Sequence, residues 1–158
     1  PYYPGTGSLT EVGSGPGKGY TVTLPLSYGM GDDDYIYAFK EILLPICDRF
    51  KPEAVLVSAG FDAYYNDPLG GMAVTEDGYA AMTRLLLEIA ADHCGGKALF
   101  VLEGGYDVKG LASSVKVVLL ELKRSGGALS AGEGRPSNEM VRIVNQSKEA
   151  LAPYWGEL

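Results

Sequence analysis

Two short segments of the chain combine reactive side chains with glycines that leave room for a ligand. Residues 58–63 (SAGFDA) contain the acid Asp62, and residues 102–106 (LEGGY) end on the phenol of Tyr106. Each segment follows an apolar run typical of a buried strand, and ligands of open α/β sheets bind at the carboxyl ends of strands. We therefore expect the carboxylate and the phenol to face a shared cavity at neighbouring strand ends.

Each of these residues also has a simpler interpretation. A carboxylate among apolar and aromatic neighbours is costly unless it is paired or binds a metal, so Asp62 is either a metal ligand or part of a cap or ion pair. The hydroxyl of Tyr106 could donate a hydrogen bond to a developing oxyanion, but taken alone the residue favours the interpretation as a packed tyrosine at a strand end. Residues 67–71 (DPLGG) are, by themselves, an ordinary turn signal.

The elements that must position these residues are strands alternating with helices. Residues 54–57 and 98–102 are compact apolar runs, as expected of strands buried on both faces, and residues 20–24 alternate like a strand that ends at Pro25. Apolar residues spaced three and four apart predict four helices. These run from Asp32 to Phe50 with a kink at Pro45, from Thr75 to Gly95-Gly96, from Asp107 to Leu122, and from Ser137 to Pro153. Such alternation predicts a parallel sheet of α/β class.

Composition limits the functions open to the chain. Its 158 residues are 46% hydrophobic, which suits one globular domain with a core. A net charge of -7 without a cluster of basic residues argues against direct nucleic-acid binding. The apolar runs are far shorter than the ~20 residues that span a bilayer, so we expect no membrane segment. The isolated Cys47 and Cys94 favour a reducing compartment, and we predict a cytoplasmic location.

Other candidate motifs carry little weight. The glycine-rich opening, residues 1–19, matches neither common phosphate-binding loop pattern. His93 continues the apolar spacing of its helix, so a capping or core role is expected for it. The chain has no cysteine and histidine cluster with zinc-finger spacing.

Together, four motifs resemble the zinc-dependent histone deacetylase superfamily, which includes acetoin-utilisation proteins and acetylpolyamine amidohydrolases. They are residues 3–7 (YPGTG), 58–63, 67–71 and 102–106, in the order and approximate spacing of that superfamily. Glu103 before the glycine pair is more similar to class II and bacterial members than to class I. The resemblance implies an arginase/deacetylase three-layer α/β/α sandwich with a parallel sheet.

The resemblance also implies a role for individual residues. Asp62 would be a zinc-ligating carboxylate, and Tyr106 would polarise the substrate carbonyl and stabilise the tetrahedral oxyanion. The remaining residues implied are Tyr3 and Leu69 as walls of the acyl-lysine tunnel, Gly105 at its narrowing, and the backbone carbonyl of Tyr20 at a potassium site found in some relatives. The cofactors implied are zinc and, as in some relatives, potassium.

The chain departs from the family pattern in one respect. Family members take two further zinc ligands from an Asp-x-His segment and their general bases from a His-His pair, both upstream of the Tyr-Pro-Gly-Thr-Gly loop. This chain begins at that loop, and His93 matches none of those histidines. A catalytic zinc site normally has three protein ligands. We therefore expect residues 1–125 to be the C-terminal part of a catalytic domain, and residues 126–158 to be a linker and C-terminal helix of the same domain.

Several expectations follow from such an incomplete domain. The sheet would lose strands and expose an apolar edge, so the chain should associate with itself or with the missing N-terminal half, and it should be inactive alone. The substrate, acetyl-lysine or an acetylpolyamine, stays open. A non-catalytic assembly or binding module on the same fold is the main alternative. A two-metal ureohydrolase is disfavoured, because that chemistry needs an Asp-x-Asp pair and Tyr64 occupies its second position.

Overall fold

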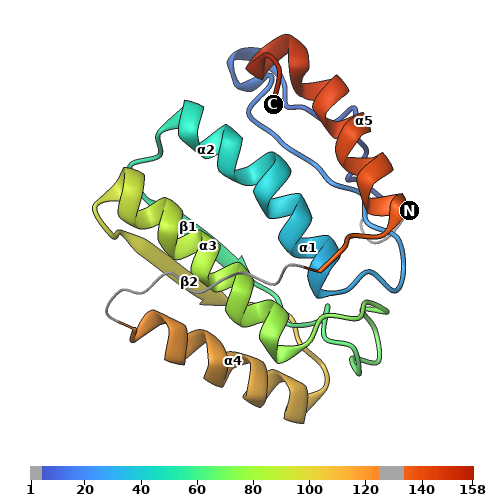
Figure 1. The fold of residues 1–158 in the computed structure, drawn as a ribbon, viewed down its shortest axis with the longest axis vertical. Helices are drawn as coiled ribbons and strands as arrows, with labels where there is room; N and C mark the ends of the chain where they lie inside the picture. Colours follow the sequence, from blue (N-terminus) through green and yellow to red (C-terminus); the bar gives the residue numbers. More distant parts are fainter. Residues whose placement is uncertain (1–4, 125–133) are drawn as a thin grey trace.

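The computed structural model describes residues 5–124 and 134–158, and within them two strands pair in parallel. Strand β1 (Val55–Ala59) and strand β2 (Ala98–Leu102) align from Val55 opposite Ala98 to Ala59 opposite Leu102. The long helix α3 (Glu76–Cys94) connects them and lies along the sheet (Figure 1). This strand–helix–strand unit confirms the predicted α/β class and the parallel pairing.

The remaining helices surround this unit. In chain order they are a short 3-10 turn at Gly15–Gly17, α1 (Asp32–Ala38), a π-helical turn at Phe39–Leu43, α2 (Leu44–Phe50), α4 (Val108–Leu122) and α5 (Asn138–Trp155). Helix α4 packs beside α3, whereas α5 packs against α1 and the π-helical turn.

Local capping signals fix several helix ends where the sequence predicts them. The carboxylate of Asp107 accepts the first free N–H groups of α4, and the hydroxyl of Ser137 accepts the Met140 N–H of α5 at 3.1 Å. Helix α3 ends at Gly95, whose φ of 59° suits glycine. Pro153 does not end α5, which continues to Trp155, so that predicted boundary is wrong by two residues.

The predicted kink at Pro45 takes the form of the π-helical turn just before it. Proline has no N–H to donate and crowds the carbonyl four residues back, and a wider turn relieves both problems. The extra residue in the turn changes which side chains face the core. Ile36, Ile42 and Ile46 are buried, whereas Phe50, the last residue of the predicted helix, is 54% exposed.

Two predictions about strands are wrong. Residues 20–24 form no strand and have no ladder partner among the described residues. The strands are also not buried on both faces, because Leu56 is 73% and Leu99 57% exposed on the face opposite α3. The described residues thus form one helical layer against the sheet and leave its other face uncovered.

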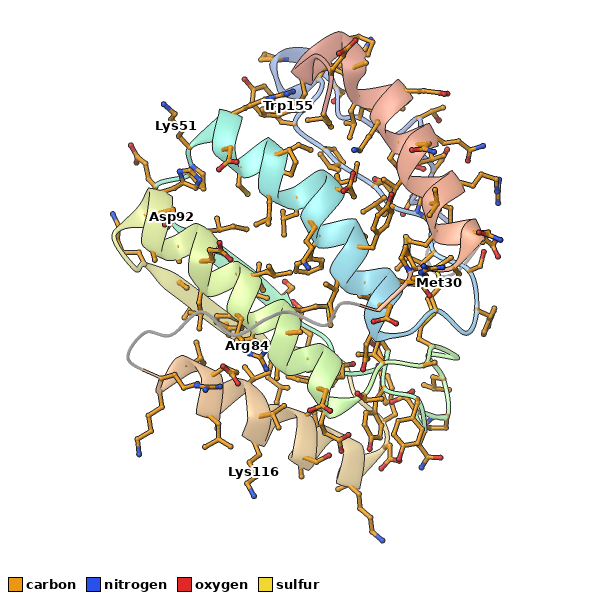
Figure 2. All side chains as sticks on the ribbon, in the orientation of Figure 1. Met30, Lys51, Arg84, Asp92, Lys116 and Trp155 are labelled. Carbon is orange, nitrogen blue, oxygen red and sulfur yellow. The ribbon has the colours of Figure 1, made fainter. Side chains whose placement is uncertain are left out.

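The core has two main parts. One joins α1, the π-helical turn and α2 to α5 through buried residues that include Ile42, Met140 and Val144. The other joins the segment between β1 and α3 to α3 itself and includes Phe61, Val74 and Tyr79. Figure 2 shows Trp155 near the end of α2, where its ring meets the rings of Tyr20 and Phe50 edge-on at 5.7 and 6.4 Å.

None of the helices within residues 5–124 and 134–158 combines the length and the apolar composition needed to cross a bilayer.

Candidate functional site

The loops that follow the two strands are tied together by backbone hydrogen bonds. The N–H of Glu103 donates to the carbonyl of Ala59 at 3.0 Å, and the N–H of Phe61 donates to the carbonyl of Gly104 at 2.9 Å. These bonds continue the parallel pairing past the end of the sheet. The segment of Asp62 is therefore held beside the glycine pair that precedes Tyr106.

The carboxylate of Asp62 lies in a space that two glycines leave open. A Cβ atom at Gly104 would stand 2.6 Å from Oδ2 of Asp62, and one at Gly60 would stand 3.2 Å from Oδ1. The half-buried carboxylate has no hydrogen bond or ion pair with the described part of the chain. The described residues therefore offer no support for Asp62 as a helix cap or as part of an ion pair.

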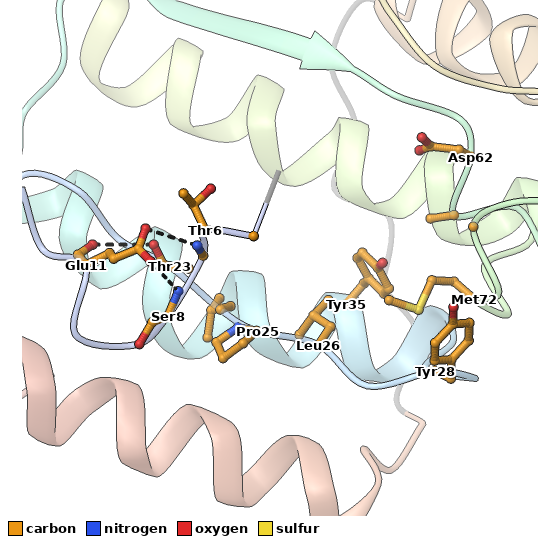
Figure 3. A pocket seen from close by; sticks show the side chains of 15 residues that line it. Thr6, Ser8, Glu11, Thr23, Pro25, Leu26, Tyr28, Tyr35, Asp62 and Met72 are labelled. Carbon is orange, nitrogen blue, oxygen red and sulfur yellow. Dashed lines mark hydrogen bonds between the residues drawn. The ribbon is translucent and has the colours of Figure 1, made fainter. Parts of the chain in front are cut away.

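Asp62 lines a cavity of about 840 Å³. In Figure 3 it lies on the loop after β1, across the cavity from Thr6, Ser8 and Glu11. Tyr106 is not among the lining residues, and its side chain is 55% exposed. The expected shared cavity is therefore not formed by the described residues; the two side chains are related through the backbone of residues 104 and 105.

Tyr35 is a second group at this cavity, and sequence reasoning missed it. Burial of the phenol, with added repulsion from the carboxylates of Asp62 and Asp34, raises the pKa of Tyr35 to about 12. The phenol therefore keeps its proton at neutral pH. An aromatic residue in the first turn of a helix gives no sequence signal for this position.

Asp67 is the most connected carboxylate of the site. It is only 8% exposed, and its oxygens accept N–H groups from two loops, those of Leu69 and Gly70 in its own turn and those of Tyr106 and Asp107 after β2. Burial alone would raise the pKa of this carboxyl group, but the four hydrogen bonds outweigh it and the pKa is lowered. The sequence at this position indicates only a turn.

Glu11 holds the opening loop in a similar way. Its carboxylate accepts the N–H of Gly7 at 3.0 Å and that of Ser8 at 3.1 Å, as the dashed lines of Figure 3 show. Hydrogen bonds from Gly7 and then Ser8 lower the pKa of Glu11. Sequence reasoning missed this contact as well.

The other predicted site residues are spread more widely. Leu69 is 54% exposed, beside the Asp67 contacts. Gly105 has a φ of 135° and faces the side chains of Phe61 and Leu111. Tyr20 is 63% exposed, and its ring packs against Phe50 and Trp155 rather than lining the cavity. Tyr3 lies outside the described residues.

The fit of a metal ion can be judged from these residues. No group of three or more His, Cys, Asp and Glu side chains that could hold a metal occurs within residues 5–124 and 134–158. His93 is paired with Asp48 at 3.0 Å, in keeping with a structural role. The unpaired carboxylate of Asp62 suits one ligand of a zinc ion, but the described residues do not make a complete site.

Comparisons with known proteins agree with the motifs. Residues 1–122 match the family described as the histone deacetylase domain. Histone deacetylase 15 of Arabidopsis thaliana is 50% identical over 151 residues, which are 95% of this chain and 25% of that protein. Polyamine deacetylase HDAC10 of Homo sapiens is 40% identical over 148 residues, which are 93% of this chain and 22% of that protein. The chain thus spans about a quarter of the length of these relatives.

A solved structure gives the same assignment. The crystal structure of the HDA15 HD domain superposes with a TM-score of 0.85 at 40% identity, over 98% of this chain and 40% of that one. This confirms the predicted fold class, an incomplete arginase/deacetylase α/β/α sandwich. Since the family match covers most of the chain and agrees with the fold, this chain belongs to the histone deacetylase family.

Proposed function

We propose that this chain is the C-terminal part of the catalytic domain of a zinc-dependent deacetylase that hydrolyses acetyl-lysine-type or acetylpolyamine amides. The observation that carries the proposal is the carboxylate of Asp62, which has no hydrogen bond or ion pair with the described residues and lies against Gly104, two residues before the exposed phenol of Tyr106. A carboxylate and a phenol delivered by paired loops are the parts of amide hydrolysis that this chain contributes.

In this proposal Asp62 supplies one carboxylate ligand of the zinc ion, and the remaining ligands and the general base come from the N-terminal part of the domain. Bound zinc would supply Lewis acidity toward the amide carbonyl. Tyr106 donates a hydrogen bond from its hydroxyl to the carbonyl oxygen as negative charge develops there. Leu69 and Tyr3 border the acyl chain of the substrate, and Gly105 lets the tunnel narrow.

The uncovered face of the sheet supports the proposal that another polypeptide segment packs against this chain. Leu56, Leu99 and Val101 are each about half exposed or more, at 73%, 57% and 48%. The HDA15 HD domain is more than twice as long as the part that this chain matches. We propose that the N-terminal part of the domain covers this face and completes the active site, so that the chain is inactive alone.

The test is reconstitution with that N-terminal part. The complex should bind zinc and hydrolyse an acetyl-lysine peptide or an acetylpolyamine, whereas the chain alone should do neither. Asp62→Asn should abolish zinc binding. Tyr106→Phe should keep the zinc and lower kcat by ~10² to 10³-fold, the usual effect of losing one oxyanion donor.

A matched control separates these effects from a simple loss of charge. Asp92→Asn removes an exposed carboxylate near the end of α3 and should leave zinc binding and kcat unchanged (Figure 2). A reconstituted complex that binds zinc but hydrolyses neither substrate would favour the non-catalytic assembly module instead.

A further inference from the structure

The carboxylate of Asp67 joins the two loops that carry the proposed substrate and catalytic residues. Oδ1 accepts the N–H of Leu69 at 2.9 Å and that of Gly70 at 3.0 Å. Oδ2 accepts the N–H of Tyr106 at 2.6 Å and that of Asp107 at 3.3 Å. One buried side chain thus fixes both the turn after β1 and the start of α4.

We propose that Asp67 is a positioning residue of the deacetylation reaction, which holds the backbone of Tyr106 in register with the turn of Leu69. This inference rests on the proposed function, since it assigns a consequence to the placement of the Tyr106 phenol. Neither the turn signal in the sequence nor a capping role accounts for the two hydrogen bonds that reach across to the second loop.

The backbone around Tyr106 needs such a restraint. Two glycines precede it, and glycine places few limits on φ and ψ, so the chain before the phenol is not stiff by itself. The residue after it, Asp107, is the N-cap of α4. Asp67 therefore holds Tyr106 at the junction between a pliable segment and a rigid helix.

A second contact joins the same two segments one residue away. The amide of Asn66 donates to Oδ2 of Asp107 at 2.6 Å, while Asp107 donates its own N–H to Asp67. Neighbouring residues of the turn and of the helix start thus exchange hydrogen bonds in both directions. This pairing sets the position of the helix start relative to the turn, and with it the position of Tyr106.

Only an ionised carboxylate can serve both loops. Each of its oxygens accepts hydrogen bonds, whereas a neutral amide has one accepting oxygen and an NH₂ group that would face N–H donors. Asp67→Asn keeps the shape of the side chain, so it can hold either the turn at Leu69 or the backbone at Tyr106, but not both. We expect the asparagine to keep its hydrogen bonds to the turn, because the N–H groups of Leu69 and Gly70 lie in the same segment as the side chain.

The first measurement follows the hydrogen bonds directly. Amide hydrogen exchange of the 158-residue chain, followed by NMR, should show in Asp67→Asn faster exchange at Tyr106 and Asp107, by about tenfold or more, with the Leu69 and Gly70 amides little changed. Asp67→Ser is the second variant, in case the first does not fold. Its hydroxyl can keep the turn but is too short to reach Tyr106.

The second measurement asks whether the restraint matters for the reaction. In the complex with the N-terminal part of the domain, Asp67→Asn should lower kcat by about 10- to 100-fold and change KM much less, since a misplaced catalytic group costs rate. In the double variant with Tyr106→Phe the two losses should not add, because Asp67 acts through the phenol. The exposed Asp92→Asn is the control in both measurements.

The outcomes separate the inference from the proposed function. Unchanged exchange at Tyr106 in Asp67→Asn, or losses in kcat that multiply in the double variant, would overturn the positioning role while leaving the deacetylase proposal intact. An unchanged kcat in Tyr106→Phe would overturn the proposed function and the positioning role with it. In that case the exchange data would still establish the hydrogen bonds of Asp67.

Discussion

The carboxylate of Asp62 packs directly on the backbone of Gly104, with Oδ2 at 2.6 Å from the position that a Cβ atom would take. The two residues come from different strand ends, 42 positions apart in the sequence. Glycine at position 104 therefore has a packing role, because any side chain there would occupy the space of the carboxylate. The orientation of the Asp62 carboxylate, the proposed metal ligand, therefore depends on the absence of a side chain at position 104.

Gly104→Ala should displace the carboxylate of Asp62 without unfolding the protein. The clash involves the free end of a side chain, which can rotate away, so we expect the free energy of unfolding to fall by less than about 1 kcal/mol. Zinc affinity of the complex with the N-terminal part of the domain should fall by about 10- to 100-fold, as when a group that orients a ligand is lost. Competition with a chelator measures that affinity.

The control for this substitution is Gly17→Ala. A Cβ atom at Gly17 meets nothing within 4 Å, so its replacement should change neither stability nor zinc binding. Equal zinc affinities for Gly104→Ala and Gly17→Ala would show that Asp62 does not act as a ligand from its present position.

Gly105→Ala, one residue further, should instead destabilise the fold. Gly105 has a φ of 135°, and its Cβ would stand 3.0 Å from both the Cβ of Phe61 and a methyl group of Leu111. Backbone strain and contact with core atoms should together cost about 1–3 kcal/mol. Urea unfolding of the chain, compared with Gly17→Ala, measures this loss. A difference below about 0.5 kcal/mol would contradict the strain argument.

The parts of the fold that the sequence predicted well depend on local signals. Asp107 and Ser137 cap helices through residues two or three positions away, and Gly95 ends α3 through its own φ. Strand formation at residues 20–24 needed a partner strand, and burial of Leu56 needed a covering layer. Neither requirement is visible in a local pattern, and both predictions were wrong.

The same distinction holds for the site. The glycine motifs placed Asp62 and Tyr106 on adjoining loops, because parallel strands deliver their ends to one edge. The roles of Asp67 and Tyr35 depend on contacts with residues that are distant in the sequence, such as the Asp67 bond to Tyr106 across 39 positions. The sequence around Asp67 indicates only a turn, and nothing in the sequence around Tyr35 points to the site.

The hydrogen bonds of Asp67 should make the protein sensitive to acid. The pKa of Asp67 is lowered below its ordinary value of 3.8, so its contribution to stability is present above that value and is lost as pH falls through the folded-state pKa. Asp67→Asn should therefore destabilise the chain more at about pH 7 than at about pH 3. Urea unfolding of both proteins at each pH gives the difference, and a difference that grows toward low pH would contradict the assignment.

The uncovered face of the sheet should drive self-association of the chain when no N-terminal part is present. Leu56 and Leu99 are paired across β1 and β2, and both are more than half exposed, at 73% and 57%. The double variant Leu56→Lys with Leu99→Glu places opposite charges on one cross-strand pair, which a sheet tolerates well. In sedimentation experiments the wild-type chain should form concentration-dependent oligomers, whereas the double variant should stay monomeric.

Two controls accompany this test: the free energy of unfolding of the double variant, and a substitution at a second exposed site. Since the replaced side chains are largely exposed, the free energy of unfolding of the monomer should change by less than about 1 kcal/mol. Val108→Glu serves as the control, because Val108 is 78% exposed at the start of α4, where an acidic residue suits the helix dipole. This control should associate like the wild type, since α4 lies on the covered side of the sheet. A wild-type chain that is monomeric at all concentrations would show that the sheet face needs no partner.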